Sequence, residues 1–284
     1  MRLNKYVAPF SLGLTATLIM GTATACRAEN TTQQMLQQTV SVSGPVELTV
    51  TSSSGDIHIR PGADGQVKVV GKLGSNYDVS IFGFHLHHDI RQSISAMPLT
   101  QHGNQIEIGP LENATNTSIN YWITVPRGTS VIAQSSSGDL EIAGVDGSLT
   151  SQTISGDISA KQINGPVSIK DTSGDVQLSV DQSPLVDVEV TSGDIDLKNI
   201  HNRLEVKNMS GDTNITGAPE QDWDVKNLSG DITLKLQNAG PFQLNAHTVS
   251  GSIKSDHVNG NGPTVRLNAI SGDITVHESK CVAD

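Results

Sequence analysis

The sequence predicts an all-β protein, a β-solenoid (β-helix-like) of roughly 18–21-residue coils with an irregular N-terminal β portion. A Ser-Gly-Asp triplet recurs at near-constant spacing through the second half of the chain. Aliphatic and polar residues alternate on both sides of each triplet. Only 3% of the 284 residues are aromatic and 27 are Gly, a composition that suits a narrow aliphatic interior better than a globular core. We therefore expect successive coils to lie on one another in chain order.

The triplet repeats set the length of a coil. Their first residues are Ser137, Ser155, Ser173, Ser192, Ser210, Ser229, Ser250 and Ser271. The step from one triplet to the next is 18 or 19 up to Ser229 and becomes slightly longer after it. One copy departs from the pattern, because Ser252 follows Gly251 where the others have Asp. An outlying copy begins at Ser54.

Each triplet is flanked by two predicted strands. Around Ser173, for example, Val167 and Ile169 precede the triplet and Val176 and Leu178 follow it. A period of two indicates a strand with one buried face. The slot six residues before the triplet also holds Trp223, which we therefore expect in the core.

The triplet itself is predicted to be a corner. Glycine permits a backbone turn that other residues resist, while Ser and Asp can bond nearby main chain. The structural turn glycines are then Gly55, Gly138, Gly156, Gly174, Gly193, Gly211, Gly230, Gly251 and Gly272. The competing fold is an antiparallel β-meander or sandwich in which each triplet closes a hairpin. Constant period and phase favour the coil.

The start of the chain has the pattern of an export signal over residues 1–25. Arg2 and Lys5 precede an apolar run, and small residues follow it. Either an ordinary signal peptidase cuts here, or Cys26 is lipidated as in a bacterial lipoprotein. We expect an exported protein of the periplasm, or of the outer membrane or cell surface of a bacterium. Any membrane contact would run through that lipid alone.

The rest of the chain divides by pattern. A polar tether is expected over 26–38 and an N-terminal β portion over 39–130. Within that portion, residues 72–104 break the rhythm and carry four of the nine histidines. The repeat solenoid is expected over 131–278, followed by a tail over 279–284.

The segment Tyr121-Trp122-Ile123-Thr124-Val125-Pro126, running into serial Ser-Gly-Asp strands, resembles a known family. This is the bacterial "putative adhesin" family of β-strand repeats, whose function is unknown. The resemblance spans about residues 38 to 278. It implies an extracytoplasmic or envelope-associated repeat protein.

Two groups of residues could bind metal. His85, His87 and His88 have the composition of a zinc site, although a polar surface loop explains them as well. The triplet aspartates would form a column at roughly 4.8 Å spacing, where calcium could offset their repulsion. The simpler account is that each Asp accepts main-chain N–H bonds at its own turn. No other cofactor is expected.

Charge and motifs exclude several functions. The net charge of −11 and the lack of a basic stripe argue against nucleic-acid binding. The sequence has no nucleophile, zinc-protease or phosphate-loop motif, so we expect no enzyme. The leading hypothesis is a cell-envelope or secreted β-repeat protein, adhesin-like or a structural scaffold and linked to envelope stress, that contacts envelope components, a surface protein or a glycan. The alternatives are a periplasmic saccharide- or metal-binding module and a polysaccharide-active enzyme. The pattern leaves the oligomeric state open.

Overall fold

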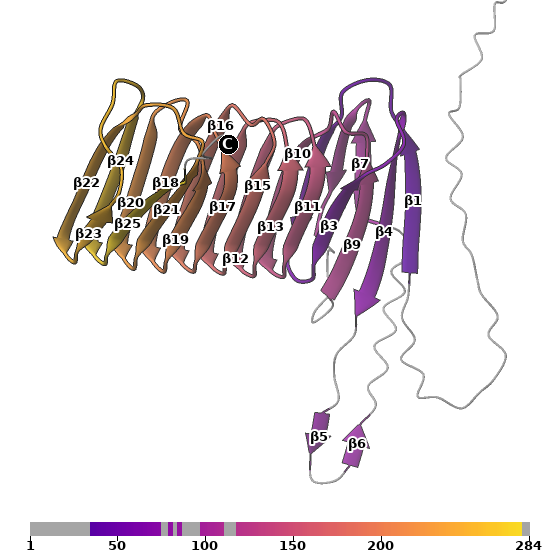
Figure 1. Ribbon diagram of the computed structural model, residues 1–284. Helices are drawn as coiled ribbons and strands as arrows, with labels where there is room; N and C mark the ends of the chain where they lie inside the picture. The colour runs from indigo at the N-terminus through magenta and orange to yellow at the C-terminus, as the bar shows by residue number, and fades with distance from the viewer. Residues whose placement is uncertain (1–34, 75–78, 82–83, 87–96, 111–117, 280–284) are drawn as a thin grey trace, which may run out of the picture.

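The computed structural model is a two-sided stack of strands (Figure 1). It describes residues 35–74, 79–81, 84–86, 97–110 and 118–279. All regular elements in these ranges are β-strands, arranged in two long sheets and one hairpin. None of the described residues forms a helix of the length and apolarity that a membrane crossing requires.

Each coil contributes one strand to each long sheet. Sheet B contains, in spatial order, β22 (Gln243–Ser250), β24 (Thr264–Ser271), β20 (Trp223–Ser229), β18 (Arg203–Ser210), β16 (Leu185–Ser192), β14 (Val167–Ser173), β12 (Leu149–Ser155), β10 (Ser130–Ser137), β2 (Glu47–Ser52), β8 (Gln105–Ile108) and β7 (Leu99–His102). Sheet A contains β1 (Met35–Ser41), β4 (Gln66–Gly74), β9 (Ser118–Val125), β3 (Ile57–Pro61), β11 (Leu140–Val145), β13 (Ile158–Ile163), β15 (Val176–Val180), β17 (Ile195–Ile200), β19 (Thr213–Gly217), β21 (Ile232–Gln237), β25 (Ile274–Ser279) and β23 (Ile253–Ser255). The strands β5 (Val79–Ile81) and β6 (Phe84–Leu86) form a separate antiparallel hairpin.

The repeats pair in parallel and in register, which confirms the solenoid and shows that the meander alternative is wrong. In sheet B, Ser155 lies beside Ser173, and Ser173 lies beside Ser192. In sheet A, Ile158 lies beside Val176. An antiparallel meander would have paired each strand with the strand across its own triplet. Here the two strands that flank a triplet belong to opposite sheets.

The interior is the aliphatic column that the alternation predicts. The four slots around Ser173 are filled by Val167, Ile169, Val176 and Leu178, all at most 2% exposed. Trp223 is fully buried, as its slot predicts, and its indole N–H donates to the Asn202 carbonyl at 2.7 Å. Because the sheets face each other across one side-chain layer, small aliphatic residues fill the space.

The order of coils in space departs from chain order at both ends, so the expectation of strictly sequential stacking is wrong there. The last coil of the chain, β24–β25, pairs with β20–β21 on one side and with β22–β23 on the other. The coil β22–β23 is therefore the spatial end. At the opposite end, β2–β3 lies between β10–β11 and the pair β8 and β9.

The N-terminal end of the stack, which we call the N-terminal pole, is closed by antiparallel strands. Strands β4 and β1 extend sheet A beyond β9, and β7 extends sheet B beyond β8. Strand β1 begins at Met35, inside the segment expected to be a tether. The expected excursion is also narrower than 72–104, because residues 72–74 continue β4 and residues 99–102 form β7.

Candidate contact surfaces

The Ser-Gly-Asp corner runs the length of the stack and brings glycines of successive coils into contact. All nine turn glycines have positive φ, between 112° and 157°. A β-carbon on Gly193 would lie 1.8 Å from the carbonyl oxygen of Gly174. The corner therefore requires glycine for its backbone conformation and for the close approach of the next coil.

The triplet aspartates form a ladder between coils. The N–H of Asp157 donates to Oδ1 of Asp139 at 2.9 Å, and the N–H of Asp175 donates to Oδ1 of Asp157 at 2.9 Å. The same bond links each later pair of coils. The expectation that each Asp bonds its own turn is therefore wrong, because the donor belongs to the adjacent coil. Each carboxylate thus accepts a hydrogen bond from a main-chain N–H at the glycine corner that would otherwise lack a partner.

The two ends of this ladder explain its exceptions. At the N-terminal pole, Oδ1 of Asn120 accepts from the N–H of Asp56, and its amide donates to Oδ2 of Asp56. At the other end, the N–H of Ser252 donates to Oδ1 of Asp273 at 2.7 Å, and this contact lowers the pKa of Asp273. No further coil follows Ser252 within the described chain. Thus the one triplet without Asp is the one whose carboxylate would have no coil to bond.

A second column of polar side chains lies inside the corner, two residues before the triplet, in all coils except those with Val190 and Ala269. Asn208 donates to the carbonyls of Gly193 and Gly211 at 3.1 Å, and Asn227 donates to Gly211. Asp171 occupies the same slot, where Oδ1 accepts from the N–H of Ser173 and Oδ2 is buried without a partner. Burial raises the pKa of Asp171 to about 6, because its charged form lacks the donors it would have in water.

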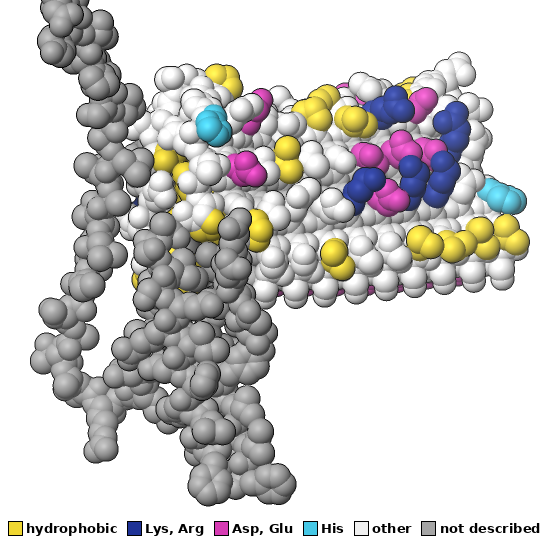
Figure 2. All heavy atoms as spheres, turned by 180° about the vertical axis from the view of Figure 1, so that it is seen from behind, with side chains coloured by type: hydrophobic (Ala, Val, Ile, Leu, Met, Phe, Trp, Pro, Cys, Tyr) yellow, Lys and Arg dark blue, Asp and Glu magenta, His cyan; other side chains and the backbone are white. Residues whose placement is uncertain are grey.

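Exposed aliphatic side chains follow the outer side of the same corner. The residue just before the triplet is aliphatic or Met in the four coils nearest the C-terminal end, and the strand registers place these residues side by side. In spatial order they are Met209, Leu228, Ile270 and Val249, and they are 44–72% exposed. Figure 2 shows hydrophobic side chains in a line along the lower edge of the body. We call these four residues the aliphatic row.

Charged residues gather beside the row on the outer face of sheet B (Figure 2). Lys207 pairs with Glu205 at 2.8 Å, and Lys226 pairs with Asp224 at 2.8 Å. The hydrogen bond from Lys207 holds the pKa of Glu205 below its usual value, whereas burial raises the pKa of Asp187 nearby. The charges described on this face are largely neutralised by ion pairs. The exposed side chains of the aliphatic row have no such partners.

The outer face of sheet A carries a cluster near the N-terminal pole. Trp122 points outward at 39% exposed, while its neighbour Tyr121 is buried. The His58 ring stacks on Trp122 with ring centroids 5.3 Å apart. Glu141 contacts Nδ1 of His58 and the guanidinium of Arg60, each at 2.9 Å, and these contacts lower the pKa of Glu141. An aromatic edge therefore lies beside a carboxylate and a guanidinium.

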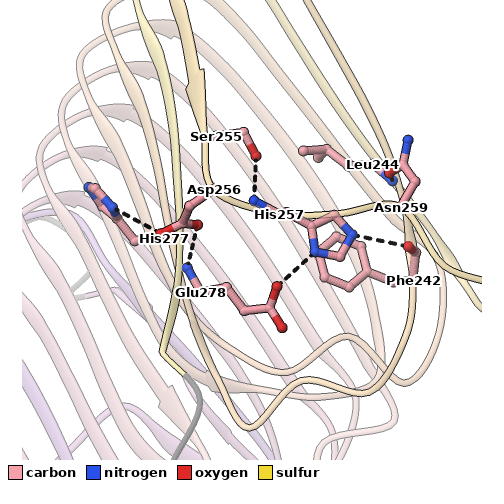
Figure 3. Close-up of polar contacts among 8 residues, drawn as sticks. All are labelled: Phe242, Leu244, Ser255, Asp256, His257, Asn259, His277 and Glu278. Carbon is pink, nitrogen blue, oxygen red and sulfur yellow. Dashed lines mark hydrogen bonds and ion pairs between the residues drawn. The ribbon is translucent and has the colours of Figure 1, made fainter.

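The C-terminal end of the stack, the C-terminal pole, is formed by β22, β23 and the loop 256–263. His257 in this loop stacks on Phe242 with ring centroids 3.6 Å apart (Figure 3). Its Nδ1 lies 2.9 Å from Glu278, and its Nε2 lies 3.1 Å from the Phe242 carbonyl. Both contacts are to groups that can accept a hydrogen bond. These contacts fix the loop against the start of β22.

The histidines predicted to bind metal lie partly outside the described residues. His85 lies in β6 with its backbone paired to Ser80 of β5, whereas His87 and His88 are outside the described ranges, as is Cys26, the candidate for lipidation. Among the residues that the structure describes, no group of three or more His, Cys, Asp or Glu could hold a metal ion. A shallow hollow beside His102 is lined by Glu47 and Glu107 on sheet B.

Comparison with protein families matches residues 46–277, nearly the whole stack, to the family described as Toastrack DUF4097. The chain belongs to the Toastrack family. This membership confirms the family resemblance drawn from the repeats. In Figure 1 the coils of the Toastrack chain lie side by side at regular spacing along the stack.

Other comparisons concern overall architecture. A crystal structure described as a "putative adhesin" from Bacteroides fragilis is 12% identical, has a TM-score of 0.47 and covers 87% of this chain and 97% of its own. Another, described as a "putative cell adhesion protein" from Clostridium sporogenes, is 12% identical, has a TM-score of 0.28 and covers 87% of this chain and 100% of its own. The comparison with curated proteins found no match.

Sequence reasoning missed several features of this Toastrack chain. It did not identify Asn120 as the first member of the Asp ladder, because Ser118-Ile119-Asn120 lacks the glycine. It also passed over the aliphatic row, although four aliphatic residues directly before a Ser-Gly pair are visible in the repeats. The longer steps between triplets after Ser229 were the available signal for the displaced coil, since they provide the longer loops it needs.

Proposed function

We propose that this Toastrack protein is a non-enzymatic, exported envelope or secreted protein that makes adhesin-like or scaffolding contacts along its Ser-Gly-Asp corner. The aliphatic row is the observation that carries the proposal. Four large side chains at strand spacing on a rigid corner form a continuous apolar strip, and contiguous exposed apolar surface of this kind is typical of interaction sites.

The corner is suited to contact because it is rigid. Each coil bonds the next through backbone pairs in both sheets and through the Asp ladder. An apolar strip held at fixed spacing loses little conformational entropy on binding. Its partner would be an envelope component with an extended apolar edge, such as a surface protein.

A retention assay tests this function. The exported chain would be incubated with isolated envelope fractions and with peptidoglycan, and the bound fraction measured. Met209→Ser with Leu228→Ser should lower retention at least tenfold. The control is Ile132→Ser, an exposed aliphatic residue on β10 away from the row. Equal retention of wild type and the double variant would contradict the proposal. It would also be contradicted if the wild-type chain bound to none of the fractions.

A saccharide-binding role is the second candidate, favoured by the cluster of Trp122, His58, Arg60 and Glu141. Aromatic and paired polar groups are typical of sites that orient small polar ligands. Trp122→Ala should then abolish binding on a glycan array while leaving envelope retention through the aliphatic row unchanged. Unchanged array binding in this variant would remove this candidate.

A further inference from the structure

We propose that two copies of this chain associate through their C-terminal poles, with β22 of each copy beside β23 of the other around a two-fold axis. The proposal does not depend on the proposed function, because it concerns a different surface. It rests on the incomplete burial of the terminal coil, on its free strand edges and on the placement of Ser252.

The terminal coil is the place where the solenoid interior meets solvent. The inward-facing residues of β24, Val265 and Leu267, are fully buried. Their register partners in β22, Leu244 and Ala246, are only half-buried, and Ile253 in β23 is 46% exposed. These side chains occupy the same columns as core residues, so a surface with the cross-section of a coil would complete their burial.

Both long sheets end at this pole in an edge strand. Strands β22 and β23 each have one neighbour in the described sheets. The loop 256–263 covers only the start of β22, where Oδ1 of Asn259 accepts from the N–H of Leu244 at 2.7 Å. The rest of β22 and all of β23 present an open edge that can pair with another strand. Figure 1 shows both strands at the end of the stack opposite β1.

The partner that covers this terminal coil is a second copy of the chain, because the C-terminal pole of that copy has the same cross-section. The N-terminal pole differs, since antiparallel β1, β4 and β7 close it, so head-to-tail stacking would not continue the coil pattern. A two-fold axis along the strand direction brings two C-terminal poles together with strands antiparallel. The terminal coil spans residues 242–263, and this length agrees with the roughly 20–30 residues per side of a standard interface.

The charges at the pole agree with this arrangement. With this axis the two Ser-Gly-Asp corners lie on the same side and their Asp columns meet end to end. The residue at the junction is Ser252, so no carboxylates face each other there. Pairing β22 with β23 of the second copy also keeps the two Lys254 side chains apart, whereas pairing β23 with itself would place like charges opposite.

The experiment measures mass and length of the exported chain in solution. Sedimentation should give a dimer, and small-angle scattering should give a maximum dimension close to twice that of one stack. Ile253→Asp should weaken association at least tenfold, because it places a carboxylate in the incomplete interior of both copies. The matched control is Ile154→Asp on β12, which is similarly exposed at 56% but lies far from the pole.

Each outcome decides the proposal. Loss of the dimer in Ile253→Asp with retention in Ile154→Asp supports it, provided that both variants keep the wild-type circular dichroism. If Ile253→Asp does not fold, the length of the wild-type dimer decides, since a side-by-side dimer would not double the maximum dimension. A monomeric wild type, a dimer of single-stack length, or equal effects of the two variants would overturn the proposal.

Discussion

At the residue scale, Asp171 is a carboxylate in a slot that suits an amide. Asn208 and Asn227 in the same column donate to glycine carbonyls, which ionised Asp cannot do. The folded pKa of about 6 lies above the ordinary 3.8. The free energy of unfolding therefore decreases as pH rises from about 4 to 6, and it stays lower above that range. A shift of this size corresponds to roughly 2–3 kcal/mol.

We therefore expect Asp171→Asn to stabilise the protein by up to roughly 2–3 kcal/mol at pH 7.5. The amide keeps the bond from Ser173 and adds a donor for the carbonyls of Gly156 and Gly174. As pH falls from about 6 toward 4 the wild-type carboxyl becomes protonated in the folded state and the difference should shrink, and it should vanish below about pH 3, where the unfolded state is protonated as well. Denaturant unfolding of both proteins from pH 4 to pH 8 measures this. A pH-independent difference would contradict the explanation.

A second prediction at this scale concerns the corner glycines. Gly193→Ala should destabilise the protein by roughly 3 kcal/mol or more, since its Cβ would overlap the carbonyl of Gly174 at positive φ. Gly128→Ala is the matched control, because no atom lies within 4 Å of its added Cβ. Thermal unfolding of the two variants gives the comparison. A similarly small loss of stability in both variants would mean that the backbone at the corner can accommodate a β-carbon.

At the scale of the element, the Asp ladder acts as a side-chain bond between adjacent turns. Asp194 accepts from the N–H of Asp212 at 2.8 Å, and Asn120 shows that an amide oxygen fills the same role. We expect Asp194→Ala to be about 1 kcal/mol less stable than Asp194→Asn, because only Ala leaves the donor of Asp212 without its partner. Denaturant unfolding of the two variants side by side tests this.

The comparison with wild type separates hydrogen bonding from charge. Asp194→Asn should be at least as stable as wild type at low salt, because it removes one charge from a column of like charges. That advantage should shrink in high salt, where the column is screened. If Ala and Asn behave alike at every salt concentration, the ladder bond contributes nothing to stability.

The elements themselves were largely predictable from the sequence. The period-two alternation indicated the strands of both sheets, and the constant phase indicated parallel pairing, because identical spacing stacks identical slots. The partner of each Asp was not predictable, since its own turn and the next coil both offer an N–H. The aliphatic row and the open pole were not predictable as surfaces either, because exposure depends on which coils are neighbours.

At the scale of the whole molecule, chain order and spatial order differ where the steps between triplets lengthen, after Ser229. The coil β22–β23 comes first in the chain but lies outside β24–β25. Removing the last residues of the chain would therefore take out an inner coil, while removing an earlier segment would take out the end coil.

Deletion of residues 240–261 should leave a folded stack. It shortens the step from Ser229 to Ser271 from 42 to 20 residues, one residue more than the longest step before Ser229. The new junction reads Asn238-Ala239-Gly262-Pro263, the same four residue types as the native corner at 238–241. Strands β24 and β25 already pair with β20 and β21, so no strand has to change partners.

A chain ending at Pro263 loses a similar number of residues but should be far less stable. It lacks Val265, Leu267 and Ile274, which are buried between two coils, and β22–β23 would have to move inward to meet β20–β21. Thermal unfolding at low protein concentration compares the two, because the shortened stack exposes a new apolar pole. Equal stability of the two shortened chains would mean that the coils can exchange places, and that the displaced last coil has no energetic preference for its inner position.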